Sequence, residues 1–212
     1  MSPRLRVPTS VRPEPVNLDT LPLSMAHFRP RFPLDEIPRW AEAYTYPLGD
    51  TEPVEIGAAA KAQGYLTRPQ FLAIARWKSP RPAKHHEKND AATVEAVTRF
   101  AFTTPVESLR LSALTLLKGV QPRTASAILH LCHRDPYPMM DVRAFWSLGI
   151  DEEPRDWAAV WAEYTDTCRS IAAEAKTDLR TLDRALWGFS DHSGQVAMPA
   201  AKRGLNVKKD SP

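Results

Sequence analysis

One acid in this chain has a sequence context that could place it in a reaction. Asp141 follows the proline-rich segment 136–138 and directly precedes Val142-Arg143-Ala144-Phe145, a pattern typical of a helix start. A carboxylate fixed at such a point can stabilise positive charge that develops on a substrate, and it can also orient a water molecule. Aspartate is equally a favoured helix N-cap, so capping alone would explain its position. The two roles are compatible, because one oxygen can cap while the other faces a ligand.

The segment before this acid could bind an anion. Residues 105–117 have helical periodicity, and Gly119 ends that run, where a left-handed backbone is cheap only for glycine. Pro122 suits the first turn of a following helix. Free N–H groups at a helix N-terminus attract anions. We therefore expect this turn to contact a nucleic-acid phosphate, whereas an ordinary corner between two core helices is the alternative. The residues expected to make the contact are Lys118, Gly119, Gln121, Arg123 and Thr124.

Together these features resemble the helix-hairpin-helix/GPD superfamily of DNA glycosylases, which includes the relatives of endonuclease III. The resemblance covers residues 105–150 and rests on Leu117, Gly119, Val120, Thr124, Ala125, Pro136-Tyr137-Pro138 and Asp141. It implies an α-helical fold that extrudes a damaged base from duplex DNA and cuts its N-glycosidic bond. The sugar acquires oxocarbenium-like character in that reaction, and Asp141 would stabilise it.

The chain departs from the family pattern in the turn and in its cysteines. Gln121 stands where the family usually has a second glycine, and Pro122 removes a backbone donor beside it. Arg123 matches the position at which bifunctional members carry a lysine, and a guanidinium forms no Schiff base. The resemblance therefore implies a monofunctional enzyme with water as nucleophile, from which borohydride traps no covalent DNA adduct. With two cysteines the chain cannot hold the four-cysteine iron–sulfur cluster of some relatives, and we expect no cofactor.

Basic and aromatic residues elsewhere could complete a DNA-binding cleft. Residues 77–88 form the most basic loop expected in the folded part, and a solvated surface loop is the alternative to a DNA contact. The side chains expected to contact phosphates there are Lys78 and Arg81. The residues expected to receive an extruded base are Trp77, Tyr137 and Trp146, although each also fits a hydrophobic core. His85-His86-Glu87 does not predict a metal site, because further ligands are not evident.

The rest of the sequence predicts an all-α fold, a multi-helix arrangement of the glycosylase type that positions the turn and Asp141. Residues 35–190 show helical periodicity without a convincing alternating strand. The expected helix starts are Thr67-Arg68-Pro69-Gln70, Asn89 or Asp90, Thr104-Pro105-Val106-Glu107, and Thr177 or Asp178. The expected buried stripes are Leu109, Ala113, Leu116 and Leu117 before the turn and Ala125, Ile128, Leu129 and Cys132 after it. Residues 1–34 are expected to be disordered or loosely draped on the domain, and residues 191–212 to form a flexible basic tail.

The composition permits a nucleic-acid partner without requiring one. The 212 residues are 25% charged with a formal net charge of +3, which suits one globular domain, expected to be a monomer. No apolar run is long enough to span a bilayer and no signal peptide is evident, so we expect a cytoplasmic protein without a membrane partner. Cys132 and Cys168 are expected to be buried, reduced thiols.

Two functions remain open at this point, and both have double-stranded DNA as the partner. The first is a monofunctional DNA glycosylase of base-excision repair. The second is a non-catalytic DNA-binding protein on a glycosylase scaffold, in which Asp141 serves only as a cap. A carboxylate in an open basic cleft would favour the enzyme, and a carboxylate sealed under side chains would favour the cap. Pocket shape decides which lesion is bound, and the sequence does not reveal that shape.

Overall fold

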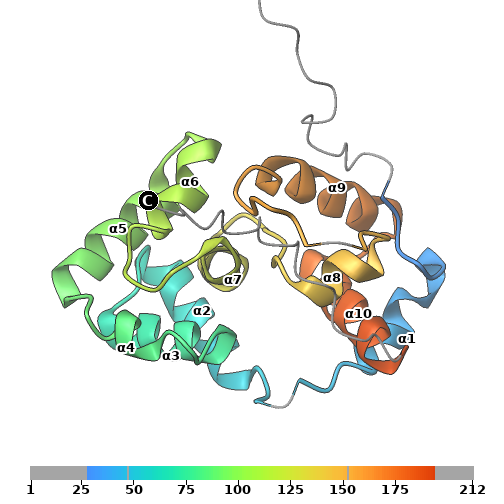
Figure 1. Ribbon diagram of the computed structural model, residues 1–212, viewed down its shortest axis with the longest axis horizontal. Coiled ribbons are helices and arrows are strands. Elements are labelled where there is room, and N and C mark those ends of the chain that lie inside the picture. Colours follow the sequence, from blue (N-terminus) through green and yellow to red (C-terminus); the bar gives the residue numbers. More distant parts are fainter. Residues whose placement is uncertain (1–27, 47, 152, 194–212) are drawn as a thin grey trace, which may run out of the picture.

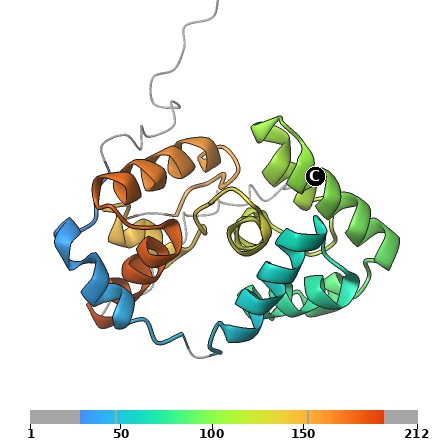
Figure 2. The same ribbon diagram turned by 180° about the vertical axis from the view of Figure 1, so that it is seen from behind.

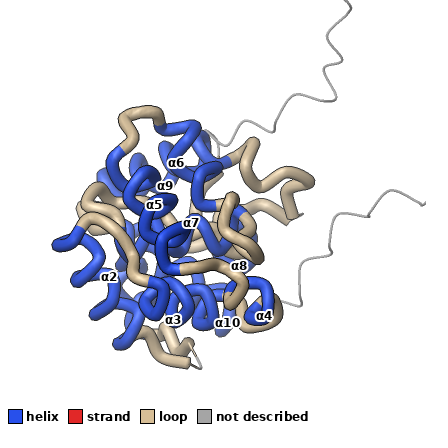
Figure 3. Tube along the Cα trace, turned by 90° about the vertical axis from the view of Figure 1, so that its left-hand side faces the viewer, coloured by secondary structure: helices blue, strands red, loops and turns tan. Residues whose placement is uncertain are grey.

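The computed structural model describes residues 28–46, 48–151 and 153–193, and these ranges contain helices and loops but no strand (Figure 3). The prediction of an all-α fold is therefore confirmed for the described residues. The elements are η3 (Leu34–Glu36), α1 (Ile37–Glu42), α2 (Thr51–Gln63), α3 (Arg68–Lys78), α4 (Ala83–His86), α5 (Ala91–Thr103), α6 (Glu107–Leu114), α7 (Pro122–Cys132), α8 (Val142–Ser147), α9 (Trp161–Glu174) and α10 (Leu179–His192).

The helices form two lobes (Figures 1 and 2). In the first lobe α7 packs against α2, α3 and α6, and in the second lobe α10 packs against α1, α8 and α9. Because α1 belongs to the second lobe, the chain crosses between lobes twice, along residues 43–50 and again along residues 133–141. These two connections lie where the lobes meet.

Helix α7 forms the centre of the first lobe. The predicted stripe of Ala125, Ile128, Leu129 and Cys132 is buried, as expected, but so are Ser126, Ala127 and Leu131. A helix buried over most of its surface belongs to a core. The Ser126 hydroxyl accepts a hydrogen bond from the Met140 N–H at 2.9 Å, which ties α7 to the chain just before Asp141. Cys132 and Cys168 are free and buried, and burial raises the pKa of each thiol to about 12.

The folded part begins earlier than the sequence predicts. Phe32 is 6% exposed within the core, and the backbone N–H of Arg31 donates to the Ser147 carbonyl at 2.8 Å. Residues 28–34 are therefore not disordered but lie along the second lobe, held by Phe32 and by the Arg31 backbone, as the alternative of a draped segment allows. Residues 1–27 lie outside the described residues. At the other end α10 continues to His192, and the predicted tail beyond residue 193 also lies outside the described residues.

Most predicted helix starts are confirmed, and one is wrong. Thr67 forms a full capping box, and Asp90 and Asp178 cap α5 and α10 with their side chains. The Thr104 hydroxyl, in contrast, accepts from the Val106 N–H at 3.2 Å, and α6 begins only at Glu107. Helix α6 therefore begins later and ends earlier than predicted, at Glu107 and Leu114, and a different set of its side chains faces the core. Leu111, Ala113, Leu114 and Leu117 are buried, whereas Leu109 and Leu116, which were expected inside, are 46% and 73% exposed.

Candidate functional site

Asp141 caps α8 and also joins the two lobes. Its Oδ1 accepts from the Arg143 N–H at 3.0 Å, which is the capping contact that its sequence position suggests. Its Oδ2 accepts from the ammonium of Lys78 at 2.8 Å, and Lys78 is the last residue of α3 in the first lobe. The side chains of Lys78 and Asp141 are 8% and 19% exposed. The pair is therefore largely removed from water at the junction of the lobes.

The surroundings of Asp141 favour its ionised form. Burial acts to raise the pKa of the carboxyl, but the charge and hydrogen bond of Lys78 act to lower it, together with the Arg143 N–H and the charge of Arg123. The net effect holds the pKa below its ordinary value. Asp141 is consequently a carboxylate at neutral pH, as stabilisation of a cationic sugar requires.

Asp141 and Lys78 line a small pocket at the junction of the lobes. Its lining comes from both lobes and from the connection 43–50, and consists of Tyr44, Tyr46, Trp77, Lys78, Met139, Asp141, Ala144, Asp183 and Trp187. Its cavity volume is about 20 Å³, enough for one water molecule. A nucleobase does not fit this closed arrangement, so a base could enter only after ring side chains move or the lobes separate.

Aromatic rings form one wall of the pocket. The Tyr46 ring lies 5.3 Å from that of Trp77 and 5.7 Å from that of Trp187, measured between ring centroids. The Trp77 indole donates to the Gly49 carbonyl at 2.7 Å, and the Tyr46 hydroxyl donates to the Trp77 carbonyl at 3.2 Å. Burial, followed by the charge of Asp141, raises the pKa of Tyr46. These contacts fix the aromatic wall against the connection 43–50.

The structure places only one of the predicted base-receiving residues, Trp77, in the pocket. Tyr137 is 2% exposed, and its hydroxyl donates to Glu107 at 2.6 Å, away from the pocket. Trp146 packs on Phe189, with ring centroids 5.8 Å apart. Both predictions are wrong for this pocket, because Tyr137 is buried beside Glu107 and the half-buried Trp146 packs on Phe189, so that neither ring lines it. The aromatic residues that sequence reasoning missed are Tyr44, Tyr46 and Trp187, and no local pattern in the sequence distinguishes them from core residues.

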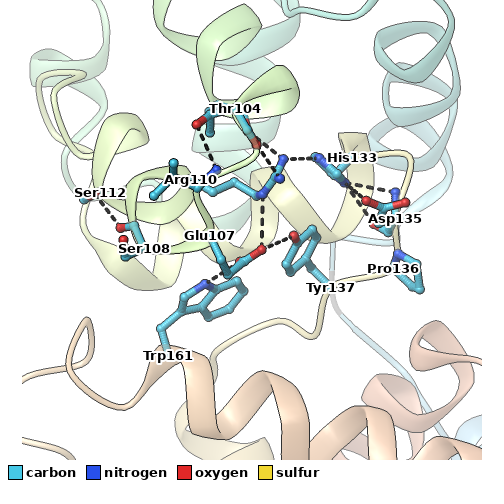
Figure 4. Close-up of polar contacts among 12 residues, drawn as sticks. Thr104, Glu107, Ser108, Arg110, Ser112, His133, Asp135, Pro136, Tyr137 and Trp161 are labelled. Carbon is cyan, nitrogen blue, oxygen red and sulfur yellow. Dashed lines mark hydrogen bonds and ion pairs between the residues drawn. The ribbon is translucent and has the colours of Figure 1, made fainter.

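Tyr137 belongs instead to a largely buried polar cluster between α6 and α9, centred on the half-buried Glu107 (Figure 4). Glu107 accepts from the Tyr137 hydroxyl, from the Trp161 indole at 3.3 Å and from Arg110 Nε at 3.4 Å. Arg110 is 7% exposed and also donates to the imidazole of His133. Burial, followed by the charge of Arg110, lowers the pKa of His133, so the neutral ring is available to accept this hydrogen bond. The cluster is a second polar link between the lobes.

The α6–α7 turn, residues 115–121, rests on the end of the basic segment 77–88 and on Asn89, which follows it. Gly119 has a φ of +86°, as its left-handed role requires, and a Cβ there would lie 2.6 Å from the ring of His86. The Asn89 side chain accepts from the Lys118 N–H at 2.8 Å and donates to the Lys118 carbonyl at 3.0 Å. His86 Nε2 lies 3.1 Å from the Gly119 carbonyl. The turn and the basic segment, both singled out from the sequence, are therefore neighbours.

The residues expected to contact phosphates differ in their exposure. Lys118, Gln121 and Arg81 are exposed, and within the described ranges the N–H groups of Gln121 and Arg123 have no hydrogen-bond acceptor. Thr124 is 3% exposed, so a phosphate contact through its side chain is ruled out in this conformation. Lys78 faces Asp141 rather than solvent, which likewise corrects its assignment.

Arg123 is engaged away from Asp141. Its guanidinium lies 5.3 Å from the centroid of the Trp157 ring and 4.0 Å from a carboxylate oxygen of Glu153. It is close enough for its charge to lower the pKa of Asp141, but no hydrogen bond joins the two described side chains.

Comparison with protein-family models, curated proteins and solved structures gives no match to this chain. None of the helices in the described ranges is long and apolar enough to cross a bilayer. Over the same residues, no group of three or more His, Cys, Asp or Glu side chains is placed to hold a metal ion.

Proposed function

We propose that this chain binds double-stranded DNA and hydrolyses the N-glycosidic bond of a damaged or mismatched base, as a DNA glycosylase of base-excision repair. One observation carries the proposal. An ionised aspartate at a helix start lines an aromatic-walled pocket between two lobes, the kind of junction at which ligand sites are often found.

The chemistry assigns a role to each part of the pocket. Extrusion of a nucleotide from the stack costs a few kcal/mol, which stacking of the base on rings such as those of Tyr46 and Trp187 would offset. Asp141 would then stabilise the positive charge on the sugar and orient the attacking water. Oδ2 becomes available for this task once Lys78 moves aside. Water is the nucleophile for removal of the base.

The α6–α7 turn would hold the DNA backbone during this step. Lys118 and Arg81 are exposed and basic. The N–H groups of Gln121 and Arg123, which have no acceptor in the described part of the chain, stand at the start of the eleven-residue helix α7. Such a surface attracts phosphates of any sequence. Recognition of the lesion would then depend on which bases the pocket admits.

The second candidate is a non-catalytic DNA-binding protein, and a specific observation favours it. Both carboxylate oxygens of Asp141 are engaged, one by the Arg143 N–H and the other by Lys78, and the pocket has room for one water. In this proposal Asp141 only caps α8 and joins the lobes, and DNA binds on the α6–α7 turn without entering the pocket.

A panel of duplexes distinguishes the two functions. Duplexes with alkylated, oxidised, deaminated and mismatched bases are scored for abasic sites with the native protein, Asp141→Asn and the control Asp90→Asn. The control changes another helix-capping aspartate, on α5, outside the pocket lining. We expect base release by the native protein and by the control, with a loss of about 100-fold or more in Asp141→Asn. DNA binding without base release from any duplex would leave the binding protein, and absence of DNA binding would refute both.

A further inference from the structure

Asp50 directly precedes helix α2 but does not cap it. Aspartate is a favoured residue at such a position, yet its side chain forms no capping hydrogen bond with α2. Its Oδ2 instead accepts from Arg184 Nη2 at 2.8 Å and from Arg180 Nη2, both on α10. Because α2 belongs to the first lobe and α10 to the second, this contact crosses between the lobes. The Asp50 carboxylate therefore serves the two arginines rather than the helix that follows it.

The two guanidiniums have more N–H donors than acceptors. Both donate to the same oxygen of Asp50, and Arg180 Nη1 lies 3.3 Å from Asp183 Oδ2 and 3.4 Å from His130 Nε2. The Nε atoms of Arg180 and Arg184 are buried, and neither has a hydrogen-bond partner in the described ranges. A guanidinium presents five donors in a fork that matches phosphate oxygens. Two such forks around one oxygen form an anion site, which the Asp50 carboxylate fills.

This arginine pair, Arg180 and Arg184, lies beside the pocket. The two guanidinium carbons are 5.9 and 5.6 Å from the centroid of the Tyr44 ring. The Tyr44 ring stacks on that of Tyr46, with 6.1 Å between centroids and 6° between planes, and both rings line the pocket. Asp183, which stands between the two arginines in the sequence, lines it as well. An anion held by the arginine pair would therefore lie next to the aromatic wall.

The site is accessible, and its present occupant is charged. The side chains of Arg184, Arg180 and Asp50 are 39%, 23% and 16% exposed, so water reaches the guanidiniums. Burial acts to raise the pKa of Asp50, but the hydrogen bonds and charges of the two arginines hold it below its ordinary value. A carboxylate and a phosphodiester are both monoanions that accept hydrogen bonds from guanidinium. One can therefore replace the other without a change in the net charge of the site.

We propose that Arg180 and Arg184 bind a phosphate of the DNA backbone beside the pocket, and that Asp50 fills this site until the DNA displaces it. The inference rests on the DNA binding of the proposed function and does not depend on base removal. It adds a second contact with the DNA backbone to the one at the α6–α7 turn.

Displacement of Asp50 would also loosen the closed pocket. Asp50 ends the connection 43–50, which carries Tyr44 and Tyr46, and its contact with α10 ties this connection to the second lobe. A nucleobase needs these rings to move, because the cavity volume is about 20 Å³. DNA already held at the α6–α7 turn would present phosphates to the arginine pair at a high effective concentration. Binding of the backbone and opening of the pocket would then be coupled.

Fluorescence-anisotropy titrations over a salt series test the proposal. The duplex carries an uncleavable abasic-site analogue, so binding does not require a base to fit the pocket. The variants are Asp50→Asn, Arg184→Gln and the combination of both. The controls are Glu95→Gln and Arg99→Gln, which alter an ion pair of 2.7 Å on the exposed side of α5 and change the net charge by the same amounts. Circular dichroism establishes that each variant is folded.

Asp50→Asn should tighten DNA binding by about 5-fold or more beyond Glu95→Gln, because it removes a competitor for the arginine pair as well as a charge. A gain in affinity cannot arise from a failure to fold. Arg184→Gln should weaken binding and reduce the slope of log K against log salt by about 1, relative to Arg99→Gln. In the double variant the gain from Asp50→Asn should be smaller, because half of the site is missing.

Three results would overturn the inference while leaving the proposed function in place. These are Asp50→Asn binding no more tightly than Glu95→Gln, Arg184→Gln having the salt slope of Arg99→Gln, and equal gains from Asp50→Asn with and without Arg184. Absence of DNA binding by the native protein would refute the inference and the proposed function together. Binding with the expected changes, but without base release from the duplex panel, would retain the phosphate site and refute the glycosylase.

Discussion

The ion pair between Lys78 and Asp141 should contribute to stability in a way that only a double-mutant cycle reveals. The variants are Asp141→Asn, Lys78→Met and the combination of both. Asparagine keeps the capping contact with the Arg143 N–H, so Asp141→Asn removes the charge and little else. Methionine is unbranched and removes the Lys78 charge with a modest change in volume.

The expected magnitudes follow from the distance and the burial. At 2.8 Å the attraction is about 6 kcal/mol for an effective dielectric constant of about 20, and desolvation of two largely buried ions offsets much of it. Asp141→Asn leaves the more deeply buried Lys78 without its partner, and we expect a loss of about 3 kcal/mol in the free energy of unfolding. Lys78→Met should lose about 1.5 kcal/mol, because the carboxylate keeps its cap and some water. The double variant should lose about 2 kcal/mol, well below the sum of the two single losses.

Urea denaturation at neutral pH, followed by tryptophan fluorescence, measures these free energies. Neutral pH is suitable because the pKa of Asp141 is lowered by folding. The contribution of the Asp141 carboxylate to the free energy of unfolding is fully present above the pKa of the unfolded chain, about 3.9, and is lost only as the pH falls through the lower pKa of the folded protein. Asp90→Asn is the control, since asparagine is an equally good cap on an exposed helix start. A loss below about 1 kcal/mol in Asp141→Asn, or additive losses in the cycle, would refute the buried-pair argument.

Three further predictions concern the turn, the histidines and the DNA contact. Gly119→Ala should destabilise the fold more than Gly64→Ala, for which the positive φ alone costs about 1–2 kcal/mol. The reason is that a Cβ at Gly119 would lie 2.6 Å from His86, whereas a Cβ at Gly64 has no atom within 4 Å. Equal melting temperatures for the two variants would contradict this. Burial lowers the pKa of His130 and of His133, so the unfolded chain binds more protons than the folded one below about pH 6.5. The free energy of unfolding should therefore fall there by at most about 1.4 kcal/mol per pH unit for each histidine. Urea midpoints that do not change between pH 7.5 and 5.5 would argue against this. Lys118→Ala should weaken binding to DNA of any sequence, and it should reduce the slope of the logarithm of the binding constant against the logarithm of the salt concentration by about 1. Fluorescence-anisotropy titrations over a salt series measure this slope. An unchanged slope would remove Lys118 from the interface.

Local features of this fold could be predicted from the sequence. The Thr67 capping box, the caps at Asp90, Asp141 and Asp178, the left-handed Gly119 and the start of α7 at Pro122 each depend on residues within about four positions. The stripe of α7 and the burial of both cysteines also follow from helical spacing. The start of α6 was wrong, because Thr104 can form either a cap or a tighter turn from the same few residues.

The sequence by itself therefore determined most helix starts, and which acid stands at the start of α8. Only the tertiary structure decided what faces that acid, because the pocket is built from segments that packing brings together from residues 44–46, 77–78, 139–144 and 183–187. The sequence shows that Lys78 is charged and that Tyr137 and Trp146 are aromatic, but it does not show which residues they contact. Packing against distant elements places the Lys78 ammonium on a carboxylate, buries Tyr137 beside Glu107 and sets Trp146 on Phe189. Helical periodicity carries no information about contacts between residues so far apart in the chain.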